Sequence, residues 1–107
     1  MKPLRLSRAA SGLVRALLAR AGDEQHRVRL SRCRSVDWQS LTFTGQRHCI
    51  ELRVEGREAA RSVTDGLDEA EFEIPGQIVA EIALSEATRV EPDGTTVLAI
   101  EALTVAE

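Results

Sequence analysis

The sequence predicts an α+β fold, in which an N-terminal amphipathic helix packs on a mostly antiparallel sheet of about five strands, with a short second helix. Three observations favour this class. The first apolar residues recur at helical spacing, many later ones alternate with polar residues, and the connections between the predicted strands are short enough for hairpins. The length of 107 residues, with 43% apolar and 29% charged side chains, is typical of one globular domain, so we expect a single domain over 1–107.

The N-terminal helix is the clearest predicted element. Ser7 is a suitable N-cap, and Gly22 is placed to end the helix. Between them the apolar residues lie three or four positions apart and so share one helical face: Ala10, Leu13, Val14, Leu17, Leu18 and Ala21. We therefore expect this helix to be part of the core.

Three strands are predicted before the second helix. Residues 26–33 alternate as a half-buried strand, and 38–44 with 46–55 predict a hairpin with a turn or bulge at Gly45. In the second arm, one face carries His48, Ile50, Leu52 and Val54, and the other carries Arg47, Glu51, Arg53 and Glu55.

The second half of the chain predicts a short helix and further strands. Residues 56–71 break the β pattern, and Asp65-Gly66 is expected to end the second helix. Beyond it we expect alternation at Phe72 and Ile74, a long strand over 77–90 with Ile78, Ala80, Ile82 and Leu84 inward, a turn at 91–94, and a last strand over 95–105.

The last predicted strand is apolar on both faces. One face has Val97, Ala99, Leu103 and Val105, and the other has Leu98, Ile100 and Ala102. Because the first helix covers one face and the second adds little, we expect the Ile100 side to need further cover. A homodimer supplies that cover most simply, and the alternative is a loop over 64–76 that folds onto the sheet.

Charge is distributed unevenly along the chain. Residues 1–34 hold nine basic and two acidic residues, while the remainder holds five basic and fifteen acidic ones. Thirteen of the fourteen basic residues are Arg, as GC-rich bacterial coding favours, so their number is not itself evidence of phosphate binding. The basic segment either packs beside the acidic one, within a chain or across a dimer, or binds a polyanion. A net charge of −3 with 3% aromatic residues favours the first, and we predict no nucleic-acid partner.

Compartment and membrane contact follow from two further features. The only cysteines, Cys33 and Cys49, are too few for a disulfide scaffold, which favours the reducing cytoplasm. Since no apolar run approaches the roughly 20 residues that cross a bilayer, we predict no membrane partner.

The densest group of chemically capable side chains lies between residues 38 and 49. We take Trp38, Arg47 and His48 as the candidate ligand-binding residues, with Arg47 as an anion anchor and His48 as an acid or base. The alternative for His48 is a hydrogen-bonded core residue, because it shares a face with Ile50 and Leu52.

No catalytic residue, metal site or cofactor is predicted. The soft ligands, His26, Cys33, His48 and Cys49, match no zinc spacing, and neither a glycine-rich phosphate loop nor a nucleophile elbow occurs. The sequence thus leaves open whether the protein is an enzyme. It favours a small cytoplasmic binding or protein-interaction module that forms a homodimer. The alternative is a small-molecule-binding protein or enzyme with a helix/sheet pocket that uses Arg47 and His48.

Overall fold

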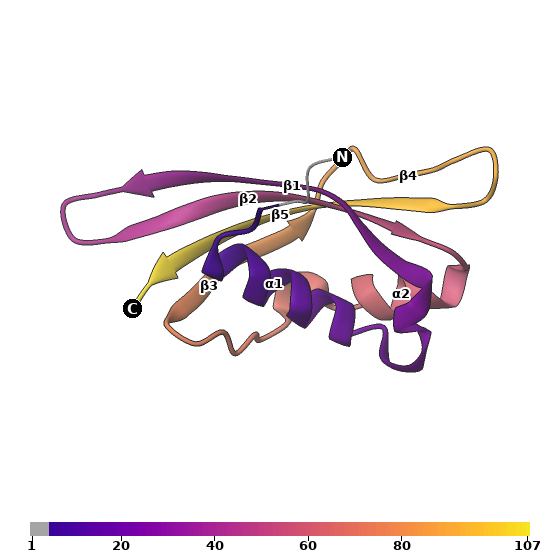
Figure 1. Ribbon diagram of the computed structural model, residues 1–107, viewed down its shortest axis with the longest axis horizontal. Helices are drawn as coiled ribbons and strands as arrows, with labels where there is room; N and C mark the ends of the chain where they lie inside the picture. Colours follow the sequence, from indigo (N-terminus) through magenta and orange to yellow (C-terminus); the bar gives the residue numbers. More distant parts are fainter. Residues whose placement is uncertain (1–4) are drawn as a thin grey trace.

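A computed structural model, which describes residues 5–107, confirms the α+β class: a five-stranded antiparallel sheet carries its helices on one face (Figure 1). Lys2, which the basic segment includes, lies outside the described residues. The strand order is β1-β2-β5-β3, with β4 also paired to β5. The elements are α1 (Arg8–Ala19), the 3₁₀ helix η1 (Gly22–Arg27), β1 (Val28–Gln39), β2 (Thr44–Val54), α2 (Arg57–Thr64), the 3₁₀ helix η2 (Leu67–Glu69), β3 (Gln77–Leu84), β4 (Arg89–Val90) and β5 (Thr96–Ala106).

Helix α1 begins as the sequence predicts, but it ends at Ala19, before Gly22, which is the first residue of η1. The Ser7 hydroxyl accepts a hydrogen bond from the Ala10 amide at 3.1 Å, as an N-cap residue should. The buried side of the helix comprises Ala9, Ala10, Leu13, Val14 and Leu17. The helix therefore belongs to the core of the domain, as expected.

The β1–β2 hairpin differs from the prediction in its first arm. Strand β1 runs without interruption where the sequence suggested two strands, and its pairing with β2 slips by one residue at Ser31, a β-bulge. The turn is at 40–43, where the Ser40 hydroxyl accepts from the Phe43 amide at 3.1 Å. Gly45 is therefore not in the turn but inside β2.

Strand β3 is shorter than the predicted strand over 77–90, and a second bulge changes its inward set. The register with β5 shifts between Val79 and Glu81, so Ile78 is exposed whereas Ile82 is buried. The predicted alternation at Phe72 and Ile74 forms no strand, apart from a single bridge between Ile74 and Gln77.

The core lies between the sheet and the helices. Strands β2 and β5 supply its centre, and the segment after α2 adds Leu67 and Ile74, which are both buried. Ile100 is 1% exposed in this core, so the expectation that its side of β5 lacks cover is wrong. Helix α1, helix α2 and the segment 64–76 together cover the Ile100 side, so this segment is not the cover for a second face that the alternative required.

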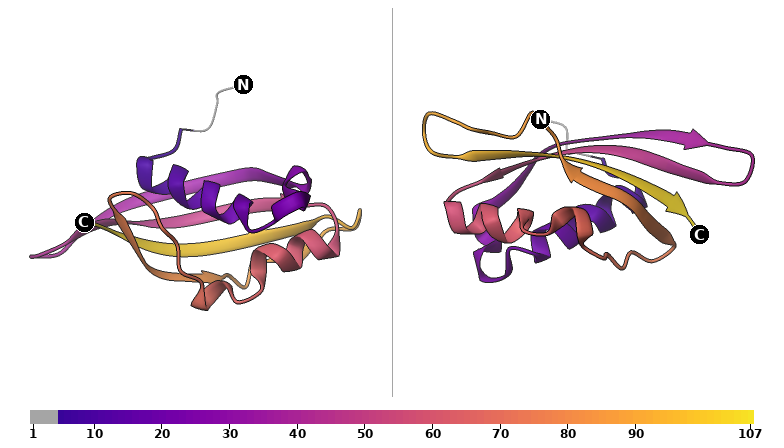
Figure 2. Two further views of the ribbon diagram at one scale, coloured as in Figure 1. Left: turned by 90° about the horizontal axis from the view of Figure 1, so that it is seen from below. Right: turned by 180° about the vertical axis from the view of Figure 1, so that it is seen from behind.

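The opposite side of the sheet has no helical cover, although Val97 on this side is 0% exposed. Both views from the side place α1, α2 and the loop that follows on one side of the strands, with no helix on the other (Figures 1 and 2). We call this second side the open face. Among residues 5–107, no helix is long and apolar enough to cross a membrane.

Candidate functional site

The open face is an ordered grid, because strand pairing aligns its side chains in five cross-strand rows. From the hairpin end these rows are Trp38, Gly45, Val105 and Ile78; Val36, Arg47, Leu103 and Glu81; Arg34, Cys49, Glu101 and Ala83; Arg32, Glu51 and Ala99; and Arg29, Arg53, Val97 and Arg89.

Polarity changes in two directions across this grid. Along the strands, the hairpin end is apolar, and Val36 and Ile78 there are about half exposed. Across the strands, β1 and β2 carry five arginines against Glu51, whereas β5 and β3 carry Glu101 and Glu81. The open face is thus basic toward one edge and acidic toward the other.

Few of these charges are paired inside the chain. The salt bridges of residues 5–107 join Arg27 to Glu24 at 2.5 Å, and Arg53 and Arg89 to Glu91 at 4.0 and 3.4 Å. None of them joins the basic first third of the described chain to its acidic remainder. The sequence allowed the basic segment to be neutralised by acidic residues of the same chain. These salt bridges do not neutralise it.

The three predicted site residues do not meet at one point. Trp38 and Arg47 lie on the open face in adjacent rows, whereas His48 points to the helix side and is 1% exposed. Arg47 and His48 both border a depression of about 500 Å³ over β2, β5 and β3. Their side chains nevertheless point to opposite faces of the sheet.

His48 is held by two hydroxyl groups from neighbouring strands. Its Nδ1 lies 2.7 Å from Ser35 Oγ, and its Nε2 lies 2.8 Å from Thr104 Oγ1. The Thr104 hydroxyl also reaches the Gln46 carbonyl at 3.5 Å, which fits a ring that donates from Nε2 and accepts from Ser35. Both ring nitrogens are therefore satisfied without a ligand.

This environment keeps the imidazole neutral. Burial lowers the pKa of His48, because the charged ring would lose its hydration. A serine beside a neutral histidine is the geometry of a nucleophile and its base, but here the ring is enclosed and only Ser35 is partly exposed. The arrangement is that of a core histidine satisfied by hydrogen bonds.

Trp38 packs over a glycine for a steric reason. A Cβ added at Gly45 would lie 2.9 Å from Cζ2 of the indole and would overlap the Thr104 carbonyl oxygen. The indole Nε1 is buried, and no residue of 5–107 accepts a hydrogen bond from it. The missing side chain at Gly45 is what allows the ring to lie there.

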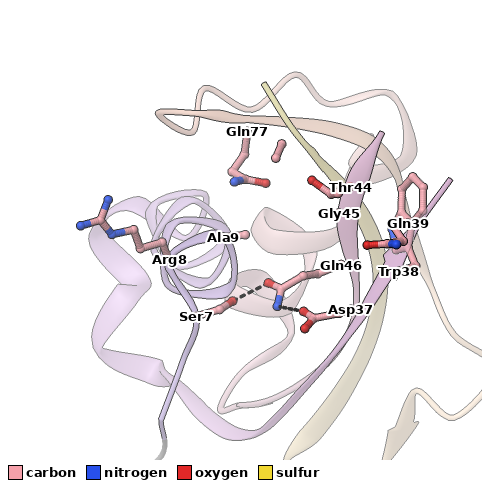
Figure 3. Close-up of a pocket in the computed structure, with 11 residues that line it drawn as sticks. Ser7, Arg8, Ala9, Asp37, Trp38, Gln39, Thr44, Gly45, Gln46 and Gln77 are labelled. Carbon is pink, nitrogen blue, oxygen red and sulfur yellow. Dashed lines mark hydrogen bonds between the residues drawn. The ribbon is translucent and has the colours of Figure 1, made fainter. Parts of the chain in front are cut away.

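A cavity of about 620 Å³ with both polar and apolar lining lies between the start of α1 and the hairpin (Figure 3). Ser7 Oγ donates to Gln46 Oε1 at 2.6 Å, and Gln46 Nε2 donates to Asp37 Oδ1 at 2.8 Å. Gln77 faces this chain of hydrogen bonds from β3 (Figure 3). No local sequence pattern predicts this site, because Ser7 and Gln46 are 39 residues apart.

The two cysteines are free and separate. Cys33 is partly buried on the helix side, and Cys49 is exposed on the open face. Burial raises the pKa of the Cys33 thiol, which makes it the less reactive of the pair. No three His, Cys, Asp or Glu side chains of the described residues gather closely enough to hold a metal ion.

Comparison with known proteins adds no relative: no family model, curated protein or solved structure matches the chain. The geometry of the site is therefore the basis on which function is assigned.

Proposed function

We propose that the protein is a homodimeric protein-interaction module, in which the open face of one chain packs on the open face of a second copy. One observation carries this proposal: every helix of residues 5–107 lies on the same side of the sheet (Figure 2). A sheet face that bears Trp38, Val36, Leu103, Val105 and Ile78 is the kind of surface that a partner covers.

The charges on the open face match a second copy. Consider a two-fold axis that is parallel to the strands and passes midway between β2 and β5. It stacks β1 on the partner's β3 and β2 on the partner's β5. Arg34 then approaches the partner's Glu81, and Arg47 approaches the partner's Glu101, one row apart in each case. Basic and acidic edges thus neutralise each other between chains, as they do not within one chain.

The size of the face also suits a dimer. Four strands at about 4.8 Å spacing and ten paired residues at about 3.4 Å rise give roughly 650 Å² of flat area. Each partner in a standard interface contributes about 800 Å². Because side chains project from the sheet, the accessible area of the face is larger than its flat area and is close to the area of a standard interface.

The first test is the state of association. Wild-type protein should sediment as a dimer at micromolar concentration. Val105→Glu should sediment as a folded monomer, because its register partners, Gly45 and Ile78, carry no charge and an unpaired carboxylate is costly to bury. Arg61→Glu, on the outer side of α2, is the matched control and should leave the dimer intact. A monomeric wild type would overturn the proposal.

Cys49 offers a second test that reports the geometry. With sheets about 10 Å apart and the two β2 strands offset by one strand spacing of about 4.8 Å, the two Cys49 Cα atoms lie roughly 11 Å apart and their facing sulfurs lie within that distance. A bismaleimide of that length should link two chains of the Cys33→Ser variant and none of the Cys49→Ser variant. If a dimer sediments but Cys49 does not cross-link, the two copies meet through another surface.

The cytoplasm remains our proposed compartment, and neither nucleic acid nor membrane is a proposed partner. Two free cysteines on opposite sides of the sheet fit a reducing environment. Stacking on the bases of a nucleic acid requires aromatic side chains, and Trp38 is the one aromatic residue in the five rows.

A second candidate function, binding of a small polar molecule, is supported by the cavity in Figure 3. Its volume of about 620 Å³ is in the range of ligand sites, and it lies between a helix and the sheet. A thermal-shift screen of small polar metabolites should then find a ligand whose stabilising effect is lost in Gln46→Leu. A ligand that stabilises this variant equally well binds elsewhere.

A further inference from the structure

A smaller depression lies at the end of the sheet away from the hairpin. Its volume is about 260 Å³, and it is lined by His26, Arg27, Arg29, Arg53, Glu55 and Thr95. This is below the 300–1,000 Å³ that is common for drug-sized ligands, so a small group fits it best.

Two of its arginines face each other across the strands. Arg29 on β1 is the direct register partner of Arg53 on β2. Like charges in this position destabilise a sheet unless something of opposite charge lies between them. Arg53 has the Glu91 carboxylate at 4.0 Å and the Asp93 carboxylate within electrostatic reach, whereas Arg29 forms no salt bridge with any of residues 5–107.

The remaining lining groups leave the depression basic. Glu55 is the single carboxylate in the lining, against the guanidinium groups of three arginines. Arg27 directs its Nε toward Glu24, outside the lining set. The Nδ1 of His26 lies 3.1 Å from the Asp23 carbonyl oxygen, within hydrogen-bond distance. The second polar atom of this ring is Nε2.

We propose that this depression binds a phosphate-sized oxyanion between Arg29 and Arg53, either free phosphate or the phosphate group of a small phosphomonoester. Guanidinium groups match such an anion because each presents planar, paired N–H donors to two oxygens. An anion there also removes the repulsion of the cross-strand pair. Arg29 and Arg53 also form the last row of the open face, whereas His26, Arg27, Glu55 and Thr95 do not belong to it, so anion binding and dimerisation are measured separately.

Titration calorimetry with inorganic phosphate, at constant ionic strength in chloride, tests the proposal. Wild-type protein should show one saturable site per chain, and Arg29→Gln should weaken it at least about tenfold, as expected for a lost charge-assisted interaction. Arg61→Gln, on α2 and outside the depression, is the matched control and should bind as wild type. Glycerol phosphate in place of phosphate distinguishes a monoester from the free ion.

Three results would overturn the site. They are no saturation by either probe, equal binding by wild type and Arg29→Gln, or far tighter binding of a single-stranded oligonucleotide with a steep salt dependence, which would assign the arginines to a nucleic-acid surface. Cross-linking through Cys49 in the same samples reports the dimer separately, so failure of one proposal is distinguished from failure of the other.

Discussion

The indole of Trp38 fills the space above Gly45 that a side chain at position 45 would occupy. Gly45→Ala should therefore lower the free energy of unfolding by about 1–3 kcal/mol, the usual range for overpacking. The Thr104 carbonyl cannot yield without a shift of β5, because it belongs to the backbone. Urea unfolding followed by the fluorescence of this single tryptophan measures the change. Thr44→Ala, one residue earlier and exposed, should be nearly neutral, and equal stability of both variants would contradict the prediction.

Leu17 is the best test of how α1 contributes to the core. Its side chain has no exposed surface, so Leu17→Ala should cost roughly 2–5 kcal/mol of stability. Arg15→Ala, on the exposed side of the same helix, should cost less than about 0.5 kcal/mol. Chemical denaturation of the three proteins gives both values. A small effect at Leu17 would mean that α1 detaches from the sheet in solution.

Arg20 joins the two helices. Its Nε donates to the Val63 carbonyl at 2.8 Å, and its Nη2 donates to the Asp65 carbonyl, so it caps the end of α2. Arg20→Ala should cost about 1 kcal/mol and should speed hydrogen exchange of the α2 amides more than those of β2. Uniform exchange changes over both elements would show that the contact acts on global stability alone.

His48 should make stability depend on pH. Its pKa in the folded state is lowered by burial, and in the unfolded state it is near 6.5. The unfolded chain therefore binds the proton more readily than the folded one. The contribution of His48 to the free energy of unfolding is fully present above about pH 6.5. It falls as the pH drops below that value, by at most about 1.4 kcal/mol per pH unit. His48→Gln should remove this part of the pH dependence, whereas His26→Gln should retain it. Identical pH profiles for wild type and His48→Gln would contradict the prediction.

Long periodic segments are what the sequence predicts well. The stripe of α1 and the alternation of 46–55 repeat often enough to fix which residues enter the core, and Ile50, Leu52 and Val54 are all buried as expected. The bulges at Ser31 and near Ala80 could not be predicted, because each depends on how a partner strand is paired. The second bulge is the reason that Ile78 points outward.

The candidate sites were harder to predict from the sequence than the core. Trp38, Arg47 and His48 are close in sequence, but alternation along β2 separates Arg47 from His48. The hydroxyl partners of His48 come from 13 residues earlier and 56 residues later, a distance over which no local pattern extends. The pairing of Arg29 with Arg53 likewise requires the strand register.

The place of β5 in the sheet determines how the domain can be assembled. It follows the other four described strands in the sequence, yet it lies between β2 and β3, which pair with each other only through it among residues 5–107. During synthesis residues 5–95 can form α1 and the β1–β2 hairpin, but β3 has no strand to pair with until β5 emerges. Folding is thus delayed until these distant contacts form, and a chain shortened before residue 96 leaves unpaired edges prone to aggregation.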